Sequence, residues 1–435
     1  MRLINSNSDM SRLLFAWTEK FGWILVAMLI VTQPFRNLFE LPMALMAIFG
    51  LLLLLLEPLR VFALSAIKPL LILFACIWLP MVASLPDAVN FSRAVSTTLV
   101  FIRFPLAAIF VIFALQNGYS RTRMLMLLGL VLGFFAIGKV FYALEVEHSL
   151  PGAMNGWAWI GRIIPQRGVG HLLAVLSPIY YYWIWQQTSK RPWIWWIAPI
   201  YLMAILLSGA RVAWIMLAMG LVLLMLQLFR VERVKWHWKS LVASILLLGI
   251  AIGISVQNSA LTARMEQTAG LFSGNFEKAN AATSLRLPIW QVAIKVAEDH
   301  WINGIGPRGF RYIYPEYVSK DDFWLNLEYK DKTTGKILTT QYGPNHPHQF
   351  LLEIIAETGI IGVLGYLLAL VYWVRLSLAA VRDRNSDALP WMTAAFIAIM
   401  PINAHMAFYA SFWSCILWWL IAVSLAYWQV GTVRK

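Results

Sequence analysis

The stretch "YGPNHPHQFLLEIIAETGIIGVLG", residues Tyr342–Gly365, places two histidines and two glutamates at the start of an apolar run. The run continues to about residue 374, and a helix of ~20 apolar residues is long enough to cross a bilayer. Ionisable groups cost free energy in such a segment unless they are paired or serve a function. The stretch therefore predicts a membrane-spanning helix whose beginning carries a functional site.

Composition supports a membrane protein over the whole chain. Of the 435 residues, 60% are hydrophobic and only 13% are charged. Apolar runs recur almost from end to end, so we expect one membrane-embedded body without a separate soluble catalytic domain. The two cysteines, Cys76 and Cys415, each lie inside an apolar run. They exclude a disulfide framework and a cysteine-rich metal site.

Apolar runs of ~20 residues predict an all-α polytopic protein with about twelve membrane-spanning helices. The runs lie near residues 21–33, 42–56, 69–85, 94–115, 124–144, 171–186, 193–209, 212–229, 240–256, 350–374, 390–408 and 411–429. This pattern divides the chain into three parts. An N-terminal membrane bundle of about nine spans covers 1–256 and includes a loop at 146–170, a large loop covers 257–348, and about three spans cover 349–435.

The positions of the basic residues predict the orientation in the membrane. Lys and Arg gather in alternate short loops, whereas the other set of loops holds chiefly Arg36 and Arg93. The positive-inside rule then puts both termini in the cytoplasm and both long loops outside. The net charge of +14 has two interpretations. One is the excess of Lys and Arg that membrane proteins usually carry on the cytoplasmic side. The other is a set of cations on the outer side that hold a phosphate or pyrophosphate. Scattered basic residues argue against nucleic-acid binding.

The two outer loops differ in pattern. The first, residues 146–170, mixes Gly, Pro and Trp with Arg162 and Arg167, which favours a segment along the membrane surface. In the second, "SLRLPIWQVAIKVAEDHWI" (284–302) predicts an amphipathic helix on or in the outer leaflet. Its predicted apolar stripe comprises Leu287, Trp290, Ile294, Ala297 and Trp301. "GIGPRGF" (304–310) predicts a turn.

His348 is the candidate general base. Pro347 blocks helix before it, so the helix is predicted to begin at about His348 or Gln349. The positive end of the helix dipole favours a neutral imidazole, which can accept a proton from a hydroxyl. An interfacial histidine without a catalytic role is the alternative, and His346 is the other candidate base.

Glu357 lies deeper in the same predicted helix. Gln349, Glu353 and Glu357 follow at four-residue steps and share one face. A carboxylate at the depth of Glu357 needs a cation, a hydrogen-bond donor or a proton, so a packing role and a catalytic role are both open. Arg103 and Lys139, two further cations in apolar runs, could pair with Glu357 or reach a lipid phosphate.

Arg211 and Arg286 are the candidate anion-binding residues. Arg211 opens a span after "LLSGA", on the same predicted side as His348. An ordinary flanking arginine is the alternative, although such residues are disfavoured on the outer side. Arg286 begins the amphipathic helix, where the dipole opposes a cation, and an anion held between the two arginines would justify both.

The sequence indicates neither a metal nor a cofactor. The acidic run "SKDDFWLNLEYKDK" has no compact ligand spacing and is typical of a solvated loop. A Walker loop, a Rossmann glycine pattern and a nucleophile elbow are all missing, which argues against ATP, dinucleotide and serine-hydrolase chemistry.

The ordered motifs resemble those of the O-antigen ligase and polymerase superfamily of bacterial inner membranes. "HPHQFLLEIIAETGIIG" resembles the family signature, and "SGARVAW" and "SLRLPIW", with Arg211 and Arg286, resemble its two arginine motifs. "HWINGIGPRGF" is similar to the family's glycine turn. One departure is Gln349, where the family more often has Asn. The residues that fit the signature spacing are His348, Leu352, Glu357, Gly359 and Gly362.

The resemblance implies a glycosyltransferase of the C type with a mainly helical periplasmic loop and an active site on the periplasmic face. It would move O-antigen glycan from undecaprenyl pyrophosphate to a sugar hydroxyl of the lipid A-core and complete lipopolysaccharide, with inversion and without a metal. Arg211 and Arg286 would hold the pyrophosphate and His348 would act as base. Possible supporting residues are His346, Glu357, Arg162, Arg167, Lys139 and Arg103.

Two alternatives stay open at this point. An O-antigen polymerase or a protein O-oligosaccharyltransferase of the same superfamily would share the motifs. A transporter or flippase of lipid-linked glycan belongs to another class and is suggested by Arg103 and Lys139. Transport predicts inverted repeats and polar residues deep in several helices, and the sequence shows neither clearly.

Overall fold

The computed structural model describes residues 2–35, 37–143, 168–188, 190–232, 266–330, 337–339, 342–403 and 406–433, together with Gly253 and Ala263. These residues form helices and one small hairpin, as expected for an all-α membrane protein. The hairpin pairs β1 (Glu328–Lys330) with β2 (Ile337–Thr339) in antiparallel register. It adds a short sheet to the large loop, which was predicted to be mainly helical.

The helices follow one another with few long connections in the described ranges. In chain order they are α1 (Arg2–Thr32), α2 (Glu40–Leu56), α3 (Pro58–Phe62), α4 (Ile67–Ala83), α5 (Phe91–Phe101), α6 (Arg103–Ala114), α7 (Gly118–Phe141), α9 (Val169–Thr188), η2 (Pro192–Ile197), α10 (Ala198–Leu207), α11 (Arg211–Glu232), η3 (Gly270–Phe272), α14 (Phe276–Ala282), α15 (Leu287–Asp299), α16 (Phe310–Ile313), η4 (Tyr314–Glu316), α17 (Phe350–Arg382), α18 (Leu389–Ile399) and α19 (Ser411–Val433).

Six segments of the described chain are long and apolar enough to cross a membrane. They are Ser11–Thr32, Phe91–Ala114, Gly118–Phe141, Arg211–Val231, Phe350–Arg382 and Ser411–Gln429. Four shorter apolar helices accompany them at Glu40–Leu56, Ile67–Ala83, Trp193–Leu207 and Leu389–Ile399. The span expected at 171–186 corresponds to α9, which is almost entirely buried. The span expected at 240–256 lies outside the described residues apart from Gly253, so the total of about twelve stays a prediction.

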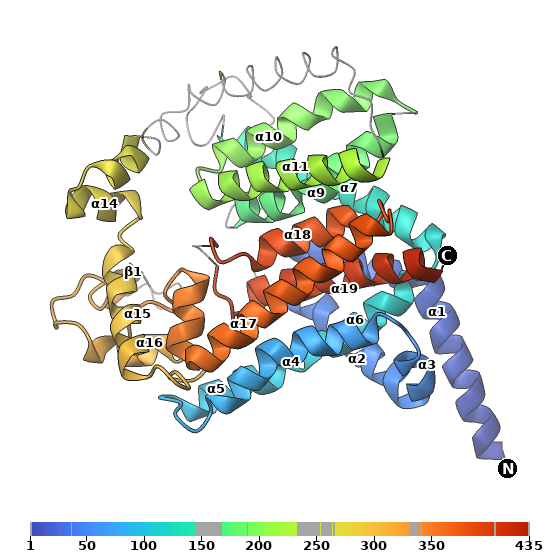
Figure 1. The fold of residues 1–435 in the computed structure, drawn as a ribbon, viewed down its shortest axis with the longest axis horizontal. Coiled ribbons are helices and arrows are strands. Elements are labelled where there is room, and N and C mark those ends of the chain that lie inside the picture. The colour runs from blue at the N-terminus through green and yellow to red at the C-terminus, as the bar shows by residue number, and fades with distance from the viewer. Residues whose placement is uncertain are drawn as a thin grey trace.

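The C-terminal helices form the centre of the bundle. In Figure 1, α17, α18 and α19 run between α2–α6 on one side and α7 and α9–α11 on the other. Helix α17 contacts α4, α19 contacts α6, and α18 contacts α9. Large aromatic side chains fill the space between them, among them the fully buried Trp391 and Trp419, whose rings meet edge to face at 5.8 Å. The last 80 or so residues therefore organise the two outer groups of helices.

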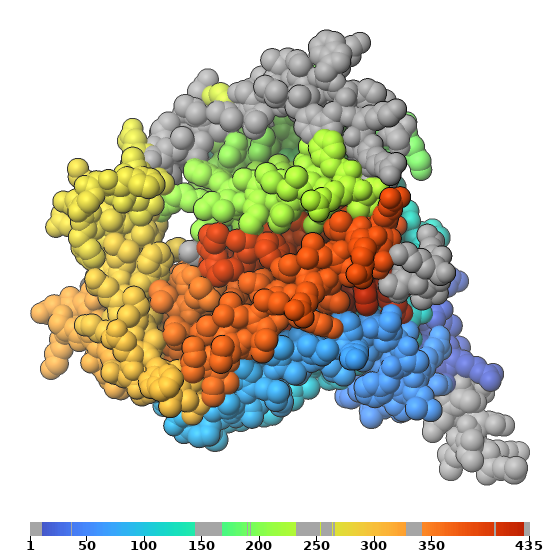
Figure 2. All heavy atoms as spheres, viewed as in Figure 1, coloured from blue at the N-terminus to red at the C-terminus, as the bar shows by residue number. Residues whose placement is uncertain are grey.

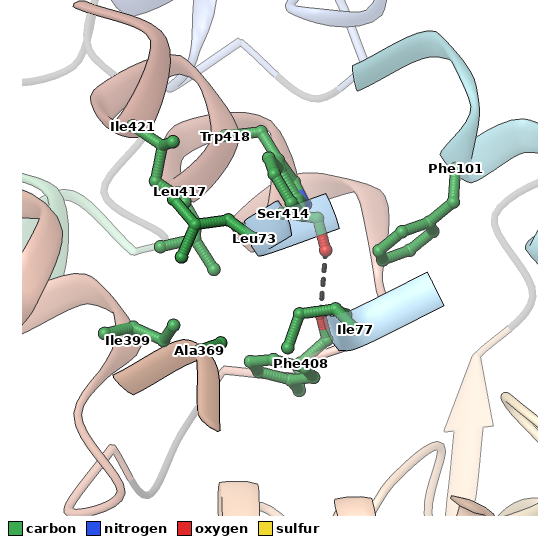
Figure 3. Close-up of a pocket in the computed structure, with 10 residues that line it drawn as sticks. All are labelled: Leu73, Ile77, Phe101, Ala369, Ile399, Phe408, Ser414, Leu417, Trp418 and Ile421. Carbon is green, nitrogen blue, oxygen red and sulfur yellow. Dashed lines mark hydrogen bonds between the residues drawn. The ribbon is translucent and has the colours of Figure 1, made fainter. Parts of the chain in front are cut away.

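An apolar pocket lies inside this bundle, where α4, α5, α17, α18 and α19 meet (Figure 3). Its only hydrogen bond between lining residues runs from the Ser414 hydroxyl to the Phe408 carbonyl, at 2.7 Å. The lining residues are Leu73, Ile77, Phe101, Ala369, Ile399, Phe408, Ser414, Leu417, Trp418 and Ile421. None of the predicted site residues that the structure describes lines it, which is consistent with a packing role.

Helix α15 is amphipathic as expected, but it buries a different face from the one predicted. Ile294 and Trp301, both assigned to the apolar stripe, are exposed. The buried residues are Ile289, Val292, Ala293, Val296 and Ala297, so Ala297 is the one buried member of the predicted stripe. This face packs against Ile305, Phe310 and Ile313, which follow α15, and against Ala356 of α17. The stripe was wrong at Ile294 and Trp301 because the partner of α15 is its own downstream segment, which helical periodicity alone does not identify.

Helix α17 is broken at Gly359, where the backbone turns to φ 62° and ψ −162°. A break in a membrane helix leaves amide and carbonyl groups unpaired, at a cost of several kcal/mol for each. The turn that follows α15 supplies their partners. Ile305 donates to Ala356 (3.0 Å), Gly306 donates to Glu357 (2.9 Å), and Ile360 donates to Trp301 (2.8 Å). The turn therefore completes the hydrogen bonding of the broken helix.

Two glycines allow this close approach. A Cβ atom at Gly359 would overlap the Ile302 carbonyl oxygen, and one at Gly304 would overlap the Glu357 carbonyl carbon. Both residues also have positive φ, 62° and 70°, which disfavours any residue with a Cβ. Gly304 and Gly359 thus serve one shared contact between the turn and α17.

We expect Gly359→Ala to lower the free energy of unfolding by about 2 kcal/mol or more, because strain at positive φ alone costs of the order of 1–3 kcal/mol. Thermal unfolding in detergent, followed by tryptophan fluorescence, measures the change. Gly118→Ala is the matched control, since a Cβ there meets its nearest atom at 3.8 Å. A Gly359→Ala protein as stable as the control would contradict the role of the break.

Candidate functional site

The site is built around the residues that precede α17. Gln349 caps this helix, because its side-chain oxygen accepts from the Leu352 amide at 2.7 Å. Its amide group also donates to the Pro401 carbonyl at 2.9 Å. The helix thus begins at Phe350, one residue after the predicted start. The side-chain amide of Gln349 therefore has a structural role at the start of α17.

His348 lies just outside the helix, in a left-handed backbone conformation with φ 59°. Such a conformation is uncommon for residues other than glycine and often occurs at functional sites. The His348 side chain is partly exposed. The position therefore combines access to a ligand with a fixed backbone.

His346 pairs with His348. The His348 amide donates to Nδ1 of His346 at 3.1 Å, and the two rings lie 4.0 Å apart between centroids. Because Nδ1 accepts this bond, a neutral His346 carries its proton on Nε2. His346 is buried, with 9% of its surface exposed, so it lies behind the more accessible His348.

Glu353 anchors the histidine pair to the bundle. This carboxylate is fully buried and accepts the amides of Phe408 and Tyr409 at 2.9 and 3.2 Å. Its Oε2 lies 3.8 Å from Nδ1 of His346. The sequence placed Glu353 on the helix face of Gln349 and Glu357 but gave it no role. The sequence feature that could have identified Glu353 is its position, a carboxylate about one turn into an otherwise apolar helix.

Glu357 holds the glycine turn. Its carboxylate is fully buried and accepts the Arg308 amide at 2.6 Å and the Phe310 amide at 3.4 Å. Its partners are therefore backbone hydrogen-bond donors, one of the three possibilities that the sequence left open, and not Arg103. Of the two interpretations, this contact favours a structural role.

Arg103 belongs to another part of the bundle, so the suggestion that it pairs with Glu357 was wrong. It forms an ion pair with Glu40 of α2, and Nη2 donates to the Ser411 hydroxyl at 2.8 Å. Helix α6 packs between α2 and α19, and this position determines its partners. Lys139 is buried at the end of α7, with its ammonium 5.1 Å from the Tyr142 ring centroid. Arg162 and Arg167 lie outside the described residues.

Arg211, the first residue of α11, contacts the segment that precedes α15. Its guanidinium donates to the hydroxyls of Thr268 and Ser284 at 3.2 and 3.1 Å. Ser284 and Leu285 are both left-handed, with φ 60° and 62°. They lead directly into Arg286, which caps the start of α15. Arg211 therefore contacts the short bend that presents Arg286.

Helix α15 then joins this bend to the histidine segment. Trp290 lies one helical turn after Arg286, and its indole donates to the Pro347 carbonyl at 3.0 Å. Pro347 directly precedes His348. Figure 2 shows an opening between the yellow segment with α14 and α15 and the rest of the bundle. Three motifs that are distant in sequence are thus joined by a short series of contacts.

Arg308 lies in the same part of the structure, and the sequence reasoning gave it no role. It lies in the glycine turn with φ 65°, beside Glu357. Its charge acts on both Glu353 and Glu357, and its Nη1 is buried without a hydrogen-bond partner. The sequence did contain a signal for Arg308, because it is the one basic residue in "GIGPRGF". That stretch was interpreted only as a turn. Within the described ranges, no group of three or more His, Cys, Asp or Glu residues is placed to hold a metal ion.

The fold is that of an α-helical membrane protein in which a histidine pair beside the buried Glu353 precedes α17, and Trp290 of α15 links the bend before Arg286 to this segment. Residues 196–367 match the family model described as O-antigen ligase. Over this stretch, which includes Arg211, Arg286, Arg308 and His348, the chain is similar to the O-antigen ligase and polymerase superfamily. The match supports a glycosyltransferase-type enzyme with a lipid-linked glycan donor and a glycan acceptor. No curated protein and no solved structure matches the chain.

Removing the Glu357 carboxylate frees two buried backbone donors, each of which costs about 1–3 kcal/mol when unsatisfied. We therefore expect Glu357→Ala to lower the midpoint of thermal unfolding strongly and Glu357→Gln to lower it less, because the amide oxygen still accepts. Glu298→Ala, at an exposed carboxylate of α15, is the matched control. Equal stability of Glu357→Ala and the control would show that the turn is held by other contacts.

Proposed function

We propose that the chain is an O-antigen ligase. It transfers O-antigen glycan from undecaprenyl pyrophosphate to a sugar hydroxyl of the lipid A-core, on the periplasmic face of the inner membrane and with both termini in the cytoplasm. The observation that carries the proposal is the connection of Arg211, through Ser284, Arg286 and Trp290, to the segment of His348. The family match supports the reaction class.

The two arginines hold the pyrophosphate. A guanidinium presents several donors in a rigid fork that matches phosphate oxygens. Arg211 is already oriented by two hydroxyls, and Arg286 follows the bend that carries one of them. Negative charge grows on the pyrophosphate as the bond to the sugar breaks. Fixed guanidinium groups stabilise this charge, as a divalent cation does in other transferases.

His348 activates the acceptor. Its imidazole takes the proton of the acceptor hydroxyl while the hydroxyl oxygen bonds to the anomeric carbon. On the opposite face, the bond from that carbon to the phosphate oxygen breaks, and undecaprenyl pyrophosphate leaves with the electron pair. The configuration at the anomeric carbon is therefore inverted. His346 acts as a positioning residue, because its Nδ1 fixes the backbone of His348.

Transfer by purified protein tests this function directly. The assay combines lipid-linked glycan with rough lipopolysaccharide, in the presence of EDTA and without ATP. We expect transfer by the wild type and a loss of about 10²–10⁴-fold in rate for His348→Ala, the usual contribution of a general base. His300→Ala, at the end of α15, is the histidine control. Near-normal transfer by purified, folded His348→Ala in the same assay would refute the base assignment.

His346→Ala distinguishes the two histidines. We expect a smaller loss than for His348→Ala, up to about 10²-fold, because a misplaced base costs rate without removing the chemistry. Rates of the two variants in the same assay provide the measurement. A larger loss for His346→Ala, with His348→Ala near normal, would reverse the two roles.

Cells that lack the protein separate the ligase from its polymerase relatives. Loss of a ligase leaves core-only lipopolysaccharide and lets lipid-linked polymer accumulate. Loss of a polymerase leaves core that bears a single repeat unit. We expect the first pattern on a lipopolysaccharide gel, and the second would assign the chain to the polymerases.

A further inference from the structure

The backbone of Arg308 is held in one place. The Arg308 amide donates to Oε2 of Glu357 at 2.6 Å. Arg308 lies in the turn that supplies hydrogen-bond partners at the break of α17. Left-handed φ at a non-glycine residue persists only where the surroundings fix it. The side chain of Arg308 therefore extends from a fixed backbone position beside α17.

The guanidinium of Arg308 forms no hydrogen bond and no ion pair with any residue that the structure describes, and its Nη1 is fully buried. A buried donor without a partner destabilises the fold, and more so when the group is charged. Native proteins contain few such groups, and each calls for an explanation. A ligand that supplies the acceptor is one explanation.

The neighbouring carboxylates do not take this role. Glu353 and Glu357 each accept two backbone amides, and neither forms an ion pair with Arg308. The charge of Arg308 nevertheless acts on both of them. An arginine whose only task was to balance these carboxylates would be expected to close an ion pair with one of them, because direct pairing is the strongest form of that interaction.

Arg308 is connected to the histidine pair through α17. Its amide binds Glu357, and Glu353, one helical turn before Glu357, lies 3.8 Å from Nδ1 of His346. The His346 and His348 rings are 4.0 Å apart. Arg211 and Arg286 approach the same segment through Trp290 and Pro347.

We propose that Arg308 is a further phosphate-binding residue of the site, whose buried Nη1 donates to a phosphate oxygen of a substrate. The identity of that substrate rests on the proposed function. Two sources share this chemistry, namely the pyrophosphate of the lipid-linked donor and a phosphate group carried by the acceptor sugars. A forked guanidinium suits either oxyanion better than a single ammonium does.

The test is direct binding by full-length protein in lipid nanodiscs, without turnover. The ligands are undecaprenyl pyrophosphate, lipid A-core with its phosphates, and the same acceptor after enzymatic dephosphorylation. We expect Arg308→Gln to weaken binding of one phosphorylated ligand at least tenfold and Arg308→Lys to weaken it less. Arg93→Gln, at an exposed arginine of α5, should bind like the wild type. The ligand that loses affinity identifies the source.

A purely structural role for Arg308 predicts another result. In that case Arg308→Gln lowers the melting temperature of the free protein, while each ligand still raises it by the wild-type amount. That outcome, or wild-type affinity of Arg308→Gln for both phosphorylated ligands, overturns the proposal. If Arg308→Gln does not fold, Arg308→Lys takes its place, and wild-type affinity of that variant for both ligands overturns it equally.

The same binding experiment keeps this inference separate from the proposed function. His348→Ala should bind both phosphorylated ligands normally, because the base does not hold phosphate. Phosphate binding that depends on Arg308 in a protein without transfer activity would contradict the ligase function alone. Transfer activity with binding that is independent of Arg308 would contradict this inference alone.

Discussion

The structure depends on one constraint, which is that the backbone groups freed at the break of α17 must find partners away from water. The segment 301–306, which ends inside the glycine turn, provides them. It can do so only because Gly304 and Gly359 let the two backbones approach closely. Glu357 then fixes the far end of the turn through two amides. A catalytic interpretation of Glu357 is not needed to explain a buried carboxylate there.

The same contact determines where the site lies. It fixes α15 and Arg308 against α17, and α15 in turn places Trp290 on Pro347. Glu353 fixes the loop before α19 on the other side of the histidine pair. Rigid elements thus surround the residues to which we assign chemistry, which is the condition for charge stabilisation without reorganisation. The opening in Figure 2 lies beside this assembly, next to α14 and α15.

The sequence predicted an all-α membrane protein because apolar length is a local property. It also predicted the start of α17, since Pro347 acts on its own neighbours. It did not predict the buried face of α15 or the ion pair of Arg103 with Glu40, because these depend on which helices become neighbours. Arg308 was missed for the same reason, as a turn shows its partners only after folding. The assigned roles of Arg211, Arg286 and His348 stay predictions.

The central claim is that one site gathers Arg211, Arg286 and His348 around a lipid-linked pyrophosphate. A cryo-electron microscopy map of the protein in nanodiscs with undecaprenyl pyrophosphate tests this most directly. The account predicts phosphate density within hydrogen-bonding distance of both guanidinium groups, with the His348 imidazole facing the same cavity. Phosphate density bound elsewhere, or His348 on the opposite side of the membrane from that density, would contradict it.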